Sequence, residues 1–146
     1  MKIYLDVCCL NRPFDDQTLD RIHLESEAVV AIMKNVESGR WDLINSDAII
    51  YEINKIPDTE RKNKILLLIS KANEYIKLDT ACLSRAKEVQ KFGIKTFDAL
   101  HVASAEMEKA DIFLTTDDAL LAKLKKYSDK IKIKTDNPLA WIKEVI

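Results

Sequence analysis

The chain has 146 residues, of which 47% are hydrophobic and 32% are charged, and its net charge at pH 7 is −1. This length predicts one domain, residues 1–146, with enough apolar material for a buried core. The near-neutral charge disfavours a protein that holds nucleic acid over a broad basic face. It weighs less against a nuclease that relies on a bound cation.

Several other classes are disfavoured by what the sequence lacks. Its apolar runs, such as Ile65–Ile69, fall far short of the roughly 18 residues that a membrane span needs. Asp6 interrupts the N-terminus before the apolar region of a signal peptide could form, so a cytoplasmic protein without a membrane partner is expected. Two glycines cannot make a Gly-rich phosphate loop. Three cysteines, two of them adjacent, fit neither a disulfide framework nor a zinc site.

Short apolar segments alternate with helical stretches along the chain. In order, the pattern predicts a strand at Ile3–Leu5, a loop at Asn11–Phe14, a helix from Asp20 capped at Gly39, a strand at Leu43–Asn45 and a helix beginning at Ser46. There follow a helix over Lys62–Ala72, a strand at Tyr75–Leu78, helices over Thr80–Phe92 and Phe97–Lys109, a strand at Ile112–Leu114, a helix over Ala119–Tyr127, a strand at Ile131–Ile133 and a helix opening at Asn137-Pro138.

Strands separated by helices imply parallel pairing with right-handed crossovers. The expected class is therefore α/β, a three-layer sandwich with a parallel sheet of about five strands and helices on both faces. Ligands of such sheets bind beyond the carboxyl ends of the strands.

Four acids far apart in the sequence are expected at that edge. Asp6 ends the first strand and Asp117 follows the fourth, while Glu52 and Asp98 lie early in helices. Helix-dipole complementarity, worth about 0.3–1 kcal/mol, explains Asp98 or Asp117 taken alone. It does not explain Asp6, which directly follows an apolar strand, or Glu52, which has apolar neighbours. A buried acid needs a partner, and hard oxygen ligands select Mg²⁺ or Mn²⁺.

Five short segments share an order and spacing typical of one family. They are Ile3-Tyr4-Leu5-Asp6, Ser46 with Glu52 six residues later, Thr96-Phe97-Asp98-Ala99-Leu100-His101 continuing in small residues to Ala105, Leu114-Thr115-Thr116-Asp117, and Asn137-Pro138. Through them the chain resembles, over nearly its whole length, a PIN-domain ribonuclease of the VapC type, the toxin of a type II toxin–antitoxin system. The segment around Asp98 is the most specific of the five.

The resemblance implies cleavage of RNA phosphodiesters by metal-activated water. Asp6 and Asp98 would be the primary ligands of Mg²⁺ or Mn²⁺, and Glu52 and Asp117 would complete the catalytic set, with Asp118 the alternative to Asp117. It also implies an antitoxin partner and, often, homodimerisation. Outside the acids, Arg12 is a candidate phosphate contact, because it comes just past the first strand.

The sequence departs from the family pattern directly after Asp6. Val7 and Cys8 stand where the family usually has Thr and a small polar residue. A hydroxyl that could orient the acid is missing there, and Asn11 or Thr116 is a candidate to replace it, with Ser46 a further supporting residue. The departure leaves open a catalytically weak or inactive PIN-like module that acts only by binding or as a scaffold.

Other interpretations fit less well. A phosphatase of the haloacid dehalogenase type needs a second Asp at position 8, where Cys8 stands, and a receiver domain needs paired acids near the first strand. A nucleophilic Cys8 or Cys9 would need a histidine partner. His101, three residues after Asp98, is interpreted as structural in preference to a proton donor, and His23 as a surface residue.

Overall fold

The computed structural model describes residues 1–146, which form five strands, eight α-helices and one short 3₁₀ helix. The elements are β1 (Lys2–Leu5), α1 (Val7–Asn11), η1 (Arg12–Phe14), α2 (Asp20–Glu37), β2 (Asp42–Ser46), α3 (Asp47–Asn54), α4 (Thr59–Ile69), β3 (Glu74–Ile76), α5 (Thr80–Gln90), α6 (Thr96–Met107), β4 (Ile112–Leu114), α7 (Asp118–Lys126), β5 (Thr135–Asp136) and α8 (Pro138–Val145).

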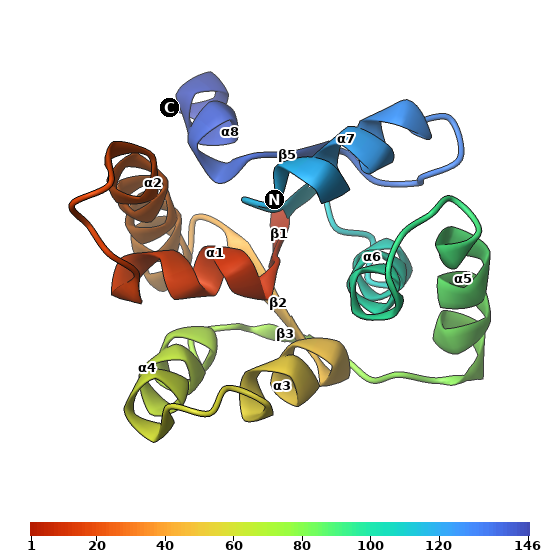
Figure 1. The fold of residues 1–146 in the computed structure, drawn as a ribbon, viewed down its shortest axis with the longest axis horizontal. Helices are drawn as coiled ribbons and strands as arrows, with labels where there is room; N and C mark the ends of the chain where they lie inside the picture. Colours follow the sequence, from red (N-terminus) through yellow and green to blue (C-terminus); the bar gives the residue numbers. More distant parts are fainter.

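All five strands are parallel, in the order β3-β2-β1-β4-β5, which confirms the predicted α/β class. Viewed edge-on in Figure 1, the sheet runs between α1 and α2 on one side and α5 and α6 on the other. Side chains of β1 and β4 are buried on both faces, as expected for a sheet covered by helices on both sides. The buried apolar residues form one continuous cluster.

The strand register brings the ends of the central strands level. Leu5 at the end of β1 pairs with Leu114 at the end of β4, and Leu114 pairs with Asp136 of β5. The residues that leave these strands, Asp6 and Thr115, therefore start from the same edge of the sheet. Ser46 leaves β2 at that edge too and caps α3, because its hydroxyl accepts the Ile49 amide at 3.0 Å.

Two predicted elements are wrong. The fifth strand lies at Thr135–Asp136 and not at Ile131–Ile133. The Glu106 carboxylate accepts a hydrogen bond from the backbone N–H of Lys132 at 2.7 Å, so this N–H is not available for strand pairing. The turn after β1 is not a simple loop: Asp6 caps the helix α1, and η1 follows it with Pro13 in its first turn. Pro13 suits that position because its missing N–H is not needed there.

A buried acid joins the first part of the chain to the last. Glu25 of α2 is 1% exposed and accepts hydrogen bonds from Arg12 at 2.9 Å, Arg21 at 3.3 Å and Asn137 at 2.5 Å. These bonds link η1, α2 and the start of α8 around one carboxylate. No helix has both the length and the apolar character needed to cross a membrane.

Candidate active site

Asp6 sits at the centre of the carboxyl edge of the sheet. It is 5% exposed, and its Oδ1 accepts the Val7 amide at 2.8 Å as the cap of α1. Burial raises the pKa of Asp6, the positive charge of His101 lowers it, and Glu52 raises it further. The second oxygen, Oδ2, accepts hydrogen bonds from the side chains of Thr115 and Cys8.

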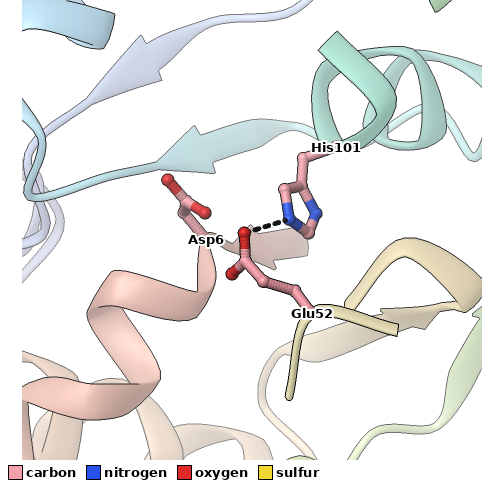
Figure 2. A group of neighbouring side chains, drawn as sticks. All are labelled: Asp6, Glu52 and His101. Atoms are coloured by element: carbon pink, nitrogen blue, oxygen red, sulfur yellow. Dashed lines mark hydrogen bonds and ion pairs between the residues drawn. The ribbon is translucent and has the colours of Figure 1, made fainter. Parts of the chain in front are cut away.

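Glu52 of α3 and His101 of α6 lie beside each other and point toward Asp6 from two different helices (Figure 2). Nε2 of His101 lies 3.4 Å from Oε1 of Glu52, and the ligand atoms of these three residues all lie within 4.8 Å of one another. Glu52 lies 46 positions after Asp6 in the chain, and His101 lies 49 positions after Glu52, yet the fold brings all three side chains together.

Asp98 and Asp117 lie outside this trio and line a small hollow together with Lys95 and Lys123. Burial raises the pKa of Asp98 to about 6, and the charges of Asp6, Asp117 and Glu52 raise it as well, against the opposing effect of His101. Each of the other three acids therefore acts electrostatically on Asp98. Asp117 itself is exposed and caps α7 by accepting the Leu120 amide at 3.1 Å.

Asp118, the alternative to Asp117, is engaged elsewhere. Arg21 holds it with two bonds of 2.6 and 2.7 Å, which lower the pKa of its carboxyl group. This bidentate pairing leaves Asp118 poorly disposed to bind a cation. The geometry therefore favours Asp117 of the two.

The hydroxyl that orients Asp6 comes from Thr115, a residue that sequence reasoning missed. Its Oγ1 donates to Oδ2 of Asp6 at 2.9 Å, and the Cys8 thiol donates to the same oxygen at 3.4 Å. Cys8 thus occupies the small polar position of the family with a weak donor of its own. Neither Asn11 nor Thr116 takes the role expected of it.

Asn11, Thr116 and Arg12 make other contacts. Asn11 accepts a hydrogen bond from Arg61 at 3.1 Å, and the Thr116 amide donates to the Cys8 sulfur at 3.4 Å. Arg12 is paired with Asp15 and Glu25, both at 2.9 Å. These carboxylates give Arg12 a role in holding η1 against α2, so a phosphate contact would have to compete with two ion pairs.

Behind the trio lies a buried chain of hydrogen bonds. The Tyr4 hydroxyl lies 2.7 Å from Nδ1 of His101 and 2.7 Å from Oγ of Ser46. His101 is fully buried; burial alone would lower its pKa, but the bond to Glu52 and the charges of Asp6, Glu52 and Asp98 raise it. Ser46 therefore supports the site through Tyr4 and His101.

An aromatic pair borders the acids on the α3–α6 side. The rings of Tyr51 and Phe97 are stacked with centroids 5.6 Å apart, and the Lys55 ammonium lies 4.8 and 4.7 Å from the two centroids. Tyr51 is 57% exposed. Each ring directly precedes a site acid in the sequence, Glu52 or Asp98, which is the signal that sequence reasoning overlooked.

The donor set fits a divalent cation. None of the four acids forms an ion pair with lysine or arginine, and the only ion-pair partner among the site residues is His101. Carboxylates held this close repel one another unless a cation neutralises them. Oxygen ligands suit Mg²⁺ and Mn²⁺.

Comparisons with known proteins identify the family and agree with the fold. The family model described as "PIN domain" matches residues 3–127. Among solved structures, the chain is similar to VapBC2 of Rickettsia felis bound to a promoter DNA fragment, at 17% sequence identity and a TM-score of 0.57. It is also similar to VapBC-1 of nontypeable Haemophilus influenzae, at 14% sequence identity and a TM-score of 0.53. Each of these two matches covers 94% of this chain and 98% of the other. PAE2754 of Pyrobaculum aerophilum is similar at 16% identity over 84% of this chain and 87% of the other, with a TM-score of 0.50. No curated protein matches the sequence significantly.

Proposed function

Because this chain belongs to the PIN domain family, whose members are generally nucleases, we propose that it is a metal-dependent endoribonuclease and the toxin of a toxin–antitoxin pair. The observation that carries the proposal is the buried Asp6, which faces Glu52 and His101 and has neither lysine nor arginine to balance its charge. A cation is the partner that such a site requires.

Asp6 is the central metal ligand in this proposal, with Glu52 beside it and Asp98 near enough to act directly or through a water molecule. Bound Mg²⁺ or Mn²⁺ would supply an activated water and stabilise negative charge on the phosphoryl oxygens. Thr115 and Cys8 keep Oδ2 of Asp6 in one orientation through their hydrogen bonds. Asp117, the exposed member of the acid set, would orient a water molecule toward the scissile phosphate.

Single-stranded RNA has a reason to bind beside these acids. Aromatic faces stack with any base, and this contributes about 1–3 kcal/mol per base in proteins that bind single strands. The stacked pair Tyr51 and Phe97 offers such a face, and Lys55 adds a positive charge next to it. Lys95 and Lys123 add charge near Asp98. These groups replace Arg12 as the main candidates for substrate contacts.

The partners follow from the structural similarity. The two VapBC structures to which the chain is similar support an antitoxin partner. That the antitoxin covers the acids, and that the chain forms homodimers, is proposed on the family resemblance. Exposed apolar side chains on α2 and α4, Leu24, Val30 and Leu67, offer surface for such contacts. A cytoplasmic location is part of the same proposal.

The test is cleavage of end-labelled structured RNAs with Mg²⁺ or Mn²⁺, with EDTA, and with a DNA of the same sequence. Asp6→Asn should abolish cutting. Asp118→Asn is the matched control, because it removes a carboxylate that Arg21 already holds, and it should cut like the parent. Cutting that persists in EDTA or in Asp6→Asn would contradict the proposal. So would the absence of cutting across a total cellular RNA pool, which would favour the binding or scaffold module.

A further inference from the structure

We propose that His101 is a direct ligand of the cation through Nε2, beside Asp6 and Glu52, and that the site therefore binds first-row transition-metal dications in preference to Mg²⁺. The inference rests on the proposed function only in assuming that a cation binds at Asp6. It adds a nitrogen donor to a set otherwise composed of carboxylates.

The geometry of the trio supports coordination. In an octahedral site with ligands at about 2.1 Å, neighbouring donor atoms lie about 3 Å apart. Nε2 of His101 is already 3.4 Å from Oε1 of Glu52, and the Asp6 carboxylate completes a group within 4.8 Å. Figure 2 shows the three side chains pointing toward one another from three different elements. Small side-chain rotations can close them around one ion.

The contact between His101 and Glu52 is easy to give up. A separation of 3.4 Å is at the long end for a hydrogen bond, so it is a weak one. A cation placed between the two would exchange it for two stronger contacts. Asp98 lies outside this group and is then a neighbouring charge, available to a water molecule or to substrate.

The second nitrogen of His101 has the support that metal-binding histidines require. Such ligands usually hydrogen-bond through their other ring nitrogen, which fixes the tautomer and the orientation of the ring. Here Nδ1 meets the Tyr4 hydroxyl at 2.7 Å, and that hydroxyl meets Ser46 at 2.7 Å. The ring is fully buried and edge-on to Tyr4, so it cannot turn away from the site.

This hydrogen-bond chain can run in either direction. With Nε2 protonated, Ser46 donates to Tyr4, Tyr4 donates to Nδ1, and Nε2–H donates to Glu52. With Nδ1 protonated, it donates to Tyr4 and Tyr4 donates to Ser46, whose oxygen has two lone pairs and accepts from Ile49 as well. The second arrangement leaves the Nε2 lone pair free for a cation.

A nitrogen donor changes which metal is favoured. Mg²⁺ binds oxygen and gives up its water reluctantly, whereas imidazole suits transition metals. Mn²⁺ is the suitable probe, because it is the weakest binder of the transition series and is paramagnetic. A preference for Mn²⁺ over Mg²⁺ is therefore the most conservative form of the prediction.

The decisive experiment is pulsed electron paramagnetic resonance of Mn²⁺ bound to the full chain. A directly coordinated ¹⁴N should appear in the echo modulation, and labelling with ¹⁵N-histidine should change the pattern. His23→Gln, which removes the exposed histidine, should leave the signal intact. Bound Mn²⁺ without nitrogen coupling would overturn the proposal while leaving a carboxylate-only nuclease in place. A chain that binds no Mn²⁺ would overturn both, so the two failures are distinguishable.

Calorimetry gives a second, independent readout. Tyr4→Phe keeps the imidazole but removes the hydroxyl beside Nδ1, and it should weaken Mn²⁺ binding about tenfold, as loss of a supporting hydrogen bond usually does. Mg²⁺ binding should change less, because it depends on the carboxylates. His101→Gln should narrow the difference in affinity between Mn²⁺ and Mg²⁺. Equal losses for both metals in both variants would count against nitrogen ligation.

Discussion

Replacing Asp98 by asparagine is expected to make the metal-free protein more stable at pH 7.5. The pKa of Asp98 is raised to about 6 by burial and by the charges of Asp6, Asp117 and Glu52. Its position in the first turn of α6 favours the ionised form, but that helix-dipole effect of about 0.3–1 kcal/mol is outweighed, since the net change in pKa is upward. The charged carboxylate therefore costs the fold free energy.

The magnitude follows from the pKa values in the two states. A rise from 3.8 to about 6 corresponds to roughly 3 kcal/mol, at about 1.4 kcal/mol per pH unit. Because Asp98 is only half-buried, screening by solvent reduces this to about 1–2 kcal/mol. For a domain of this size, each kcal/mol changes the melting temperature by about 2–4 °C, so Asp98→Asn should raise it by about 2–8 °C.

The stabilisation by Asp98→Asn should depend on pH in a characteristic way. An acid whose pKa is higher in the folded state destabilises the protein as pH rises through the interval between its unfolded and folded pKa values. The advantage of Asp98→Asn over the parent should be complete at pH 7.5, reduced to about half near pH 5, and absent below about pH 3. Saturating Mn²⁺ or Mg²⁺ should reverse the order at pH 7.5, because only the parent gains full binding energy.

The measurement is thermal unfolding followed by circular dichroism in EDTA at several pH values. Asp118→Asn is the control, because Arg21 lowers the pKa of that carboxyl group, and it should not stabilise the chain at pH 7.5. An Asp98→Asn variant no more stable than the parent in EDTA would refute the electrostatic reasoning. An advantage that does not change with pH would show that packing, and not charge, is responsible.

Substitutions at three further positions test the supporting contacts. Thr115→Val removes the 2.9 Å bond to Asp6 and should lower metal affinity about 10–100-fold by calorimetry, with little loss of fold. Cys8→Ser keeps a donor beside Asp6 and should cut RNA within a few-fold of the parent, whereas Cys8→Ala should lose metal affinity as Thr115→Val does. Glu25→Gln leaves Arg12 without its buried partner and should cost about 2–3 kcal/mol in urea unfolding, while metal affinity stays unchanged.

Much of the architecture is predictable from local patterns. Ile112–Leu114 is predicted residue for residue, because a short apolar run between helices has few alternatives. The cap of α3 at Ser46 and the left-handed Gly39 and Gly93 follow from residue chemistry alone. The β5 error has the opposite cause: a long-range contact from Glu106 to Lys132 decides the backbone there, and no local pattern contains it.

Like the fold, the candidate site has features that the sequence predicts and features that it does not. Convergence of the acids can be predicted, because strand ends of a parallel sheet share one edge. Which acids lie closest to one another cannot be predicted, because this depends on which side chains come into contact in the folded chain. His101 joins Asp6 and Glu52 only because its ring is fixed by Tyr4, a strand residue 97 positions earlier, and Thr115 reaches Asp6 from the next strand, 109 positions away.

The same contacts explain why stability and metal binding should oppose each other in this chain. Asp6 and Asp98 are kept where burial and the charges of neighbouring acids raise their pKa values, so the metal-free fold carries a free-energy cost at neutral pH. A cation offsets that cost, and at 100 times its Kd it stabilises the fold by about 2.7 kcal/mol in total. Substitutions that relieve the repulsion between these acids should therefore stabilise the metal-free protein and lower the stability of the metal-bound protein. A core substitution away from this edge should change both states equally.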